Sequence, residues 1–182
     1  MTGLPAGTGG AVLCGGASRR FGRDKSLVEI DGRPMAEHVA ATLEAAGCQP
    51  VAFVGGAGAQ LAATTCRPFV ADTWPGEGPL GGVVDALAWF HRRAANGVVV
   101  AACDLPSLTA DAVRAVAGSG GPAVAVADRP HPSLAHWPVS ATAQVAALFA
   151  AGVRSLGDAL EALGASPVTV AEAALRNVNR PT

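Results

Sequence analysis

The segment Gly97–Ala102 is the feature that most restricts the fold of this chain. It contains only apolar residues and glycine, which is typical of a strand buried on both faces of a parallel sheet. Similar apolar runs occur at Gly10–Cys14, Val51–Val54 and Pro68–Ala71, and helical patterns lie between the runs. Because parallel strands need crossover connections, this alternation predicts an α/β fold: a three-layer α/β/α sandwich, Rossmann-like, with a mostly parallel sheet.

The rest of the chain continues the same alternation. Asp72–Gly82 holds two prolines and four glycines and is predicted to be a loop, as is Gly55–Gly58. The remaining predicted strands are Pro122–Ala127, Ser133–Ala135 and Val168–Val170. The predicted helices are Pro34–Ala46, Val83–Ala95, one beginning near Thr109, Ala141–Ala151 and Ser155–Leu163. No repeat or linker interrupts residues 1–182, so we expect a single domain.

Composition excludes several classes of protein. Half the residues are apolar and 15% are charged, which favours a folded core, and a net charge of −1 argues against a nucleic-acid partner. No apolar run approaches the roughly 20 residues of a membrane helix, and residues 1–5 do not resemble an export signal. We therefore expect a cytoplasmic protein. The four cysteines are widely separated, which predicts reduced thiols rather than a zinc site.

The loop after the first strand carries the strongest chemical signal. Gly15 and Gly16 allow backbone N–H groups to approach phosphate oxygens, and three arginines and Lys25 follow within a few residues. Lys25 is the only lysine among thirteen basic residues, which suggests that a compact ammonium is needed there. A Walker A loop is excluded, because Gly16 and Gly22 enclose five residues rather than four. A basic surface loop is the alternative, but the preceding strand and glycines favour a phosphate site.

Two carboxylates also follow predicted strands. Asp104 comes directly after Gly97–Ala102, and Asp72 comes directly after Pro68–Ala71. Mg²⁺ is commonly held by one or two carboxylates together with phosphate oxygens. Asp104 is the better candidate ligand, because Thr109 is better placed than Asp104 to cap the following helix. Asp72 opens a Pro/Gly-rich turn, so it either contacts a ligand or shapes the turn.

The stretch Leu13–Lys25 resembles the L-x-G-G-x-S-x-R-[MF]-G-x-D-K signature of nucleotidyltransferases that act on small phosphorylated molecules. Further segments narrow the resemblance to the molybdenum cofactor guanylyltransferase family. These are Asp31–Met35, Gly78–Gly82, Cys103–Pro106, His131-Pro132, Trp137-Pro138 and Asn177–Asn179. The resemblance implies a fold of the nucleotide-diphospho-sugar transferase type. It also implies transfer of GMP from GTP to molybdopterin carrying molybdenum, with release of pyrophosphate.

The resemblance assigns roles to individual residues. It implies a nucleotide-binding half at about residues 8–105 and an acceptor-binding half at about 106–182. Arg20, Lys25 and Asp104 would be catalytic, and Asp104 would bind Mg²⁺. The residues that would bind the nucleotide are Leu13, Cys14, Gly15, Gly16, Lys25, Asp72 and Asp104; His131, Asn177 and Asn179 would bind the acceptor. Chaperones that mature molybdoenzymes are further expected partners.

This sequence departs from the family pattern at several positions. Cys14 stands where alanine is usual, Phe21 replaces methionine, and Arg180 replaces threonine. Gly55 and Gly56 lie where the family often has an asparagine, which puts one nucleoside contact in doubt. Three alternatives therefore stay open: a cytidylyltransferase for the same cofactor, another small-molecule-phosphate nucleotidyltransferase, and an inactive GTP-binding regulatory module.

Overall fold

The computed structural model describes residues 3–15 and 24–178. Within them, seven strands form one sheet in the order β5-β4-β1-β6-β8-β7-β9. The strands are β1 (Thr8–Leu13), β4 (Val51–Val54), β5 (Phe69–Val70), β6 (Gly97–Ala102), β7 (Ala123–Val126), β8 (Pro130–Pro138) and β9 (Ser166–Thr169). Strand β8 is antiparallel to β6 and β7, and the remaining neighbours in this sheet pair in parallel. A small antiparallel ribbon, β2 (Glu29–Ile30) and β3 (Arg33–Pro34), forms a separate sheet.

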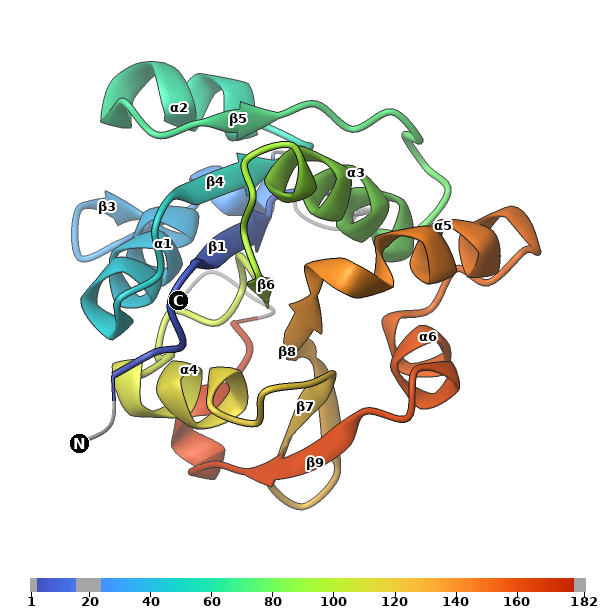
Figure 1. The fold of residues 1–182 in the computed structure, drawn as a ribbon. Helices are drawn as coiled ribbons and strands as arrows, with labels where there is room; N and C mark the ends of the chain where they lie inside the picture. Colours follow the sequence, from blue (N-terminus) through green and yellow to red (C-terminus); the bar gives the residue numbers. More distant parts are fainter. Residues whose placement is uncertain (1–2, 16–23, 179–182) are drawn as a thin grey trace.

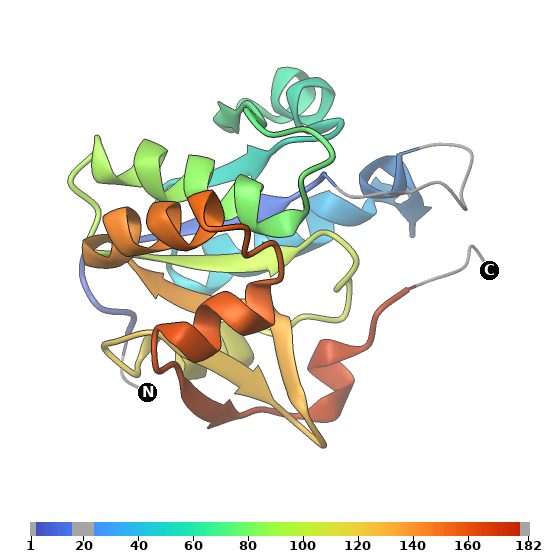
Figure 2. The same cartoon turned by 90° about the vertical axis from the view of Figure 1, so that its right-hand side faces the viewer.

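Helices cover both faces of the large sheet (Figures 1 and 2). One face carries α1 (Met35–Ala46), α2 (Gly58–Thr65), α4 (Ala110–Ala117) and the 3₁₀ turn η3 (Glu172–Leu175). The other carries α3 (Pro79–His91), α5 (Thr142–Ala150) and α6 (Leu156–Ala162). Alternate residues of β6 enter the two cores, with Val99 and Ala101 facing α1 and with Val98 and Val100 facing α3. The predicted three-layer sandwich is confirmed.

Two predicted elements, α3 and β8, have clearly different bounds in the structure. Helix α3 begins at Pro79 rather than Val83, so part of the predicted glycine loop is helical. Its glycines are needed for close packing, because a Cβ on Gly81 would lie 3.0 Å from the Cβ of Trp74. Strand β8 is longer than Ser133–Ala135. It tolerates Pro132 because the register with β7 shifts there and leaves Pro132 unpaired with that strand.

Helix α2 was not predicted at all. The sequence signal there is weak, because Gly58 begins the helix and the β-branched pair Thr64-Thr65 ends it. The loop predicted at Gly55–Gly58 is present just before it, where Gly55 and Gly56 have positive φ values of 64° and 51°. The helix ends at Cys66, which has a left-handed backbone with φ 57°.

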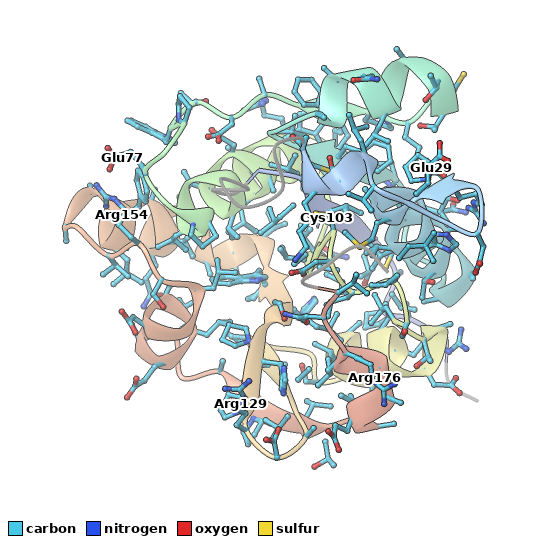
Figure 3. The ribbon with its side chains drawn as sticks, turned by 180° about the vertical axis from the view of Figure 1, so that it is seen from behind. Glu29, Glu77, Cys103, Arg129, Arg154 and Arg176 are labelled. Atoms are coloured by element: carbon cyan, nitrogen blue, oxygen red, sulfur yellow. The ribbon has the colours of Figure 1, made fainter. Side chains whose placement is uncertain are left out.

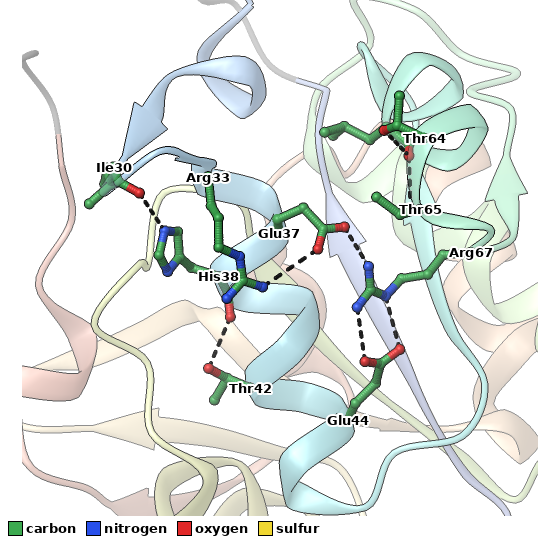
Figure 4. Close-up of polar contacts among 10 residues, drawn as sticks. Ile30, Arg33, Glu37, His38, Thr42, Glu44, Thr64, Thr65 and Arg67 are labelled. Atoms are coloured by element: carbon green, nitrogen blue, oxygen red, sulfur yellow. Dashed lines mark hydrogen bonds and ion pairs between the residues drawn. The ribbon is translucent and has the colours of Figure 1, made fainter.

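An ion cluster joins α1 to the segment that follows α2 (Figure 4). The guanidinium of Arg67 donates to both carboxylate oxygens of Glu44 at 2.9 Å and also pairs with Glu37. Glu37 is buried, and Arg33 lies 3.7 Å from its second oxygen. These hydrogen bonds lower the pKa of Glu44 and raise the pKa of Arg67.

The helices of residues 3–15 and 24–178 include none with the length and apolar character of a membrane span.

Candidate nucleotide-binding site

The carboxyl ends of the parallel strands β1, β4, β5 and β6 lie at one edge of the sheet (Figure 2), and Gly15, Asp72 and Asp104 follow three of these strands. Hydrogen bonds extend the strand pairing beyond the strand ends. Cys14 N donates to Val54 O at 2.9 Å, and Cys103 N donates to Leu13 O at 3.1 Å. The loops that begin at Gly15 and Asp104 therefore start side by side. This is the edge at which open α/β sheets bind their ligands.

Lys25 and Asp104 are in direct contact at this edge. Lys25 lies in the 3₁₀ turn η1 (Lys25–Leu27), and its Nζ donates to Asp104 Oδ2 at 2.9 Å. Both side chains are largely buried, with exposures of 15% and 19%. The other carboxylate oxygen of Asp104, Oδ1, is buried and has no hydrogen-bond partner in the described part of the chain. A buried carboxylate oxygen without a donor is suited to a cation.

Asp24 organises the loop, a role that the sequence analysis did not assign. Its Oδ1 accepts from the backbone N and the hydroxyl of Ser26, at 2.9 and 2.6 Å, and caps the turn that carries Lys25. Its Oδ2 accepts from Ala57 N at 2.9 Å and so ties this turn to the loop after β4. An aspartate directly before the only lysine is the signal that could have identified it.

The glycine pair after β4 fits against the β1 loop. A Cβ on Gly56 would lie 2.3 Å from Cys14 O, so only glycine allows this approach. A Cβ on Gly55 would lie 3.2 Å from the Cβ of Asp72. A tight backbone turn at Gly55 and Gly56 therefore packs directly against the β1 loop.

Asp72 also lies against the β1 loop. A Cβ on Gly15 would lie 3.7 Å from Asp72 Oδ2, so this carboxylate faces the glycine loop. Its other oxygen accepts from Trp74 N at 2.9 Å, which fixes the side chain within the turn. The neighbouring Thr73 is held by Asp85 of α3 through its N and its hydroxyl, both at 2.8 Å. Asp72 both shapes its turn and faces the β1 loop.

The loop after β5 also contacts residues of the predicted acceptor-binding half. Arg154 Nε donates to Glu77 Oε2 at 2.9 Å, and the two side chains point toward one another in Figure 3. The guanidinium of Arg154 stacks 4.2 Å from the centre of the Phe149 ring, and Trp74 packs against the same ring at 5.3 Å. The two predicted halves of the chain are therefore in close contact beside the site.

The predicted acceptor residues approach this edge from the other side. Val178 N donates to Asp104 O at 3.1 Å, which places Asn177 next to the Asp104 loop. His131 lies near the start of β8, and antiparallel pairing puts that end of β8 beside the carboxyl end of β6. The ring of His131 contacts Asp128, with Nε2 lying 3.5 Å from Oδ1 of that residue. Gly16, Arg20 and Asn179 lie outside the described residues.

Two buried thiols lie beneath the loops. Burial raises the pKa of Cys103 to about 12, with a further contribution from the charge of Asp104. Burial and the neighbouring Cys103 raise the pKa of Cys14 well above its usual value. Both cysteines are therefore neutral near pH 7, and Cys14 contributes its backbone rather than a nucleophile to the loop.

Comparisons with known proteins identify the family of this chain. The model of the MobA-like NTP transferase domain matches residues 10–166. A molybdenum cofactor guanylyltransferase from Cereibacter sphaeroides is 34% identical over 177 residues, which cover 94% of this chain and 91% of that protein. The crystal structure of molybdopterin-guanine dinucleotide biosynthesis protein A from Archaeoglobus fulgidus has a TM-score of 0.77 at 25% identity, covering 94% of this chain and 92% of that one.

A solved complex with manganese shares the fold. It is the Rv0371C protein of Mycobacterium tuberculosis, with a TM-score of 0.67, 18% identity, and coverage of 90% of this chain and 88% of that chain. The fold and the site together define an enzyme of the nucleotidyltransferase class. Within that class, the chain belongs to the family of the MobA-like NTP transferase domain. The resemblance identified from the signature residues is confirmed.

Proposed function

We propose that this chain transfers GMP from GTP to molybdopterin carrying molybdenum and releases pyrophosphate. The family supports this reaction, because a relative that aligns with nearly the whole chain is a molybdenum cofactor guanylyltransferase. The observation that carries the proposal is the contact between Lys25 and Asp104, which lie 79 residues apart in the sequence and 2.9 Å apart at the strand ends. Nucleotidyl transfer needs positioning and charge neutralisation, and this pair offers a cation beside a metal ligand.

Asp104 is the proposed ligand for Mg²⁺. Its buried Oδ1 has no donor among the described residues, and the ammonium of Lys25 donates to the other oxygen, Oδ2. When bound, the metal ion would neutralise charge on the phosphates. One carboxylate is sufficient, because Mg²⁺ keeps several waters and takes phosphate oxygens as further ligands.

The loop after β1 is the proposed nucleotide cradle. The backbone of Leu13 to Gly16 would receive the nucleotide, and Arg20 and Lys25 would hold the triphosphate. Asp72 faces Gly15 and would contact the same nucleotide. The phosphate group of molybdopterin is a dianion, so one of its oxygens can attack the α-phosphorus of GTP without a general base. A bond forms between the attacking oxygen and the α-phosphorus. The bond between the α-phosphorus and the oxygen that it shares with the β-phosphorus breaks, and pyrophosphate leaves.

The acceptor is proposed to bind on the opposite side of Asp104. Asn177 lies next to the Asp104 loop through the Val178 hydrogen bond, and Asn179 follows two residues later on the chain. Amide side chains provide both donors and acceptors, which suits the edge of a pterin ring. His131 would orient this substrate from the start of β8.

A nucleotide panel tests the proposed function. The protein is incubated with Mg²⁺, molybdate, molybdopterin and each of the four nucleoside triphosphates, and pyrophosphate is measured. We expect release with GTP, and none with Asp104→Ala. Asp111→Ala is the control, because that carboxylate is largely exposed on α4 and pairs with Arg114, which is not a site residue. Release with CTP in place of GTP would identify a cytidylyltransferase, and GTP binding without release would identify a regulatory module.

A further inference from the structure

Two cysteines occupy the same register position on neighbouring strands. Leu13 of β1 pairs with Ala102 of β6, and Cys103 N continues this pairing to Leu13 O. Cys14 and Cys103 are therefore the next pair along the two strands. Both side chains belong to the core on the α1 side of the sheet. The two thiols thus lie next to each other on one face.

The pair lies directly below the site loops. Cys14 precedes Gly15, and Cys103 precedes Asp104; Figure 3 labels Cys103 at this end of β6. Cys14 and Cys103 are only 4% and 7% exposed. They lie at the edge of the sheet where the site loops begin. The proposed transfer uses neither thiol.

The spacing of the strands favours a bridging ion over a disulfide. Neighbouring strands lie about 4.8 Å apart, and their side chains stand perpendicular to the sheet, so the Cβ atoms keep about that separation. A disulfide prefers Cβ atoms about 3.8 Å apart. A metal–thiolate bond of about 2.3 Å allows two sulfur atoms on one ion to be up to about 4.6 Å apart.

The number of ligands indicates the class of ion. Among the described residues, no group of three or more His, Cys, Asp or Glu side chains is placed to hold a metal. Zn²⁺ in structural sites takes four ligands, so a pair of thiols does not suit it. Thiolates select soft ions such as Cu⁺. A soft monovalent ion with two ligands fits this pair.

We propose that Cys14 and Cys103 form a two-thiolate site for a soft monovalent metal ion of the Cu⁺ class. Binding forms two S–metal bonds and releases the two thiol protons to solvent, and no electron is transferred. Two thiolates and one monovalent ion carry a net charge of −1 where two neutral thiols stood, so the bound ion would weaken the binding of the GTP anion to the loops above it. This last consequence rests on the proposed function.

Copper titration tests the site. The reduced chain carrying Cys66→Ser, which removes the exposed thiol, is titrated anaerobically with Cu⁺ against a competing chelator. We expect one Cu⁺ per chain and a thiolate–copper absorption band in the ultraviolet. Cys14→Ala and Cys103→Ala should each weaken binding at least tenfold, about 1.4 kcal/mol. Cys48→Ala is the matched control, because Cys48 is an equally buried thiol in the same core.

Two results would overturn the proposal: no bound Cu⁺, or equal affinity after Cys14→Ala. Because Cys→Ala removes only the sulfur atom from each side chain, both variants are expected to fold, and circular dichroism checks this. GTP is then titrated into the protein with and without Cu⁺, and we expect weaker binding only when Cys14 is present. If the copper-free protein binds no GTP, the proposed function fails, while the copper stoichiometry still decides the site.

Discussion

At the scale of single residues, the account depends on Lys25 beside Asp104. The sequence singled out both residues before their contact was known, Lys25 as the only lysine and Asp104 as the acid after a buried strand. Their distance could not be predicted, because it depends on the turn η1 and on the register of β1 with β6. Asp24 was missed for the same reason, since its partner Ala57 lies on another loop.

Lys25→Arg should reduce turnover at least tenfold. A planar guanidinium is larger than an ammonium, and the largely buried surroundings of Lys25 and Asp104 leave little room for it. Tenfold corresponds to about 1.4 kcal/mol of transition-state stabilisation. Steady-state pyrophosphate release measures the change, and Arg93→Lys, at an exposed residue in the turn after α3, is the reverse control. If Lys25→Arg retains most of the rate, charge alone matters at this position.

Gly56→Ala should unfold more readily than Gly120→Ala. Both glycines have positive φ, 51° and 73°, so both variants carry the penalty of a left-handed alanine. Only at Gly56 does the new Cβ also meet a backbone oxygen, that of Cys14 at 2.3 Å; around Gly120 there is open space. We expect an additional loss of about 1–3 kcal/mol, measured by urea unfolding. Equal losses would show that the β1 loop moves away freely.

At the scale of elements, the prediction was best where the local sequence pattern is most distinctive. Strands β4 and β6 match the prediction because continuous apolar runs in a parallel sheet are distinctive. Helix α3 was predicted to begin four residues late, because Gly81 and Gly82 suggest a loop when the packing of Trp74 and Leu13 against them is unknown. Helix α2 gives too weak a local signal, and its place depends on contacts with β4 and β5.

The Arg67 cluster should stabilise the contact between α1 and the segment after α2. Arg67→Met leaves the buried Glu37 without its main partner, so we expect a loss of about 1–3 kcal/mol in the free energy of unfolding at pH 7. The pKa of Glu44 is lowered by Arg67, so its share of the stability is present above the ordinary pKa of a glutamate and is lost as the pH falls through the lowered value. In urea unfolding, the stability difference between wild type and Arg67→Met should therefore become smaller as the pH falls.

Arg114→Met is the control for this cluster. Arg114 pairs with Asp111, which is largely exposed, so its removal should change stability by less than about 1 kcal/mol. A difference between wild type and Arg67→Met that stays constant from neutral to acid pH would contradict the role given to Glu44.

His136 should make the fold sensitive to mild acid. Its ring is buried in β8 against Gly97, and Nδ1 lies 2.7 Å from Gly121 O. Burial lowers the pKa of this histidine, so the unfolded chain takes up its proton at a higher pH than the folded chain. Stability should therefore decrease as the pH falls below about 6.5, the ordinary value for histidine. His136→Gln should flatten this dependence between about pH 7.5 and 5.5 in urea titrations; an unchanged slope would assign it to other groups.

At the scale of the whole molecule, the two predicted halves meet at Asp104. β1, β4, β5 and β6 bring the nucleotide loops to one edge of the sheet, and the segment after η3 returns to the same edge through Val178. The fold class was predictable because it follows from the alternation of strands and helices. The return of the C-terminal segment was not, because a polar extended stretch has no periodic pattern that fixes its position. Only the resemblance to a family suggested that Asn177 belongs to the site.

The most direct test of the account follows the phosphorus atoms of GTP. GTP labelled at the α-phosphate and GTP labelled at the γ-phosphate are each incubated with the protein, Mg²⁺, molybdate and molybdopterin. If the chain transfers GMP, the α-label appears in the pterin product and the γ-label appears in pyrophosphate, in equal amounts. Asp104→Ala should leave both labels in GTP. Transfer of the γ-label to the pterin, or its release as inorganic phosphate with the α-label remaining in GDP, would contradict the proposed reaction.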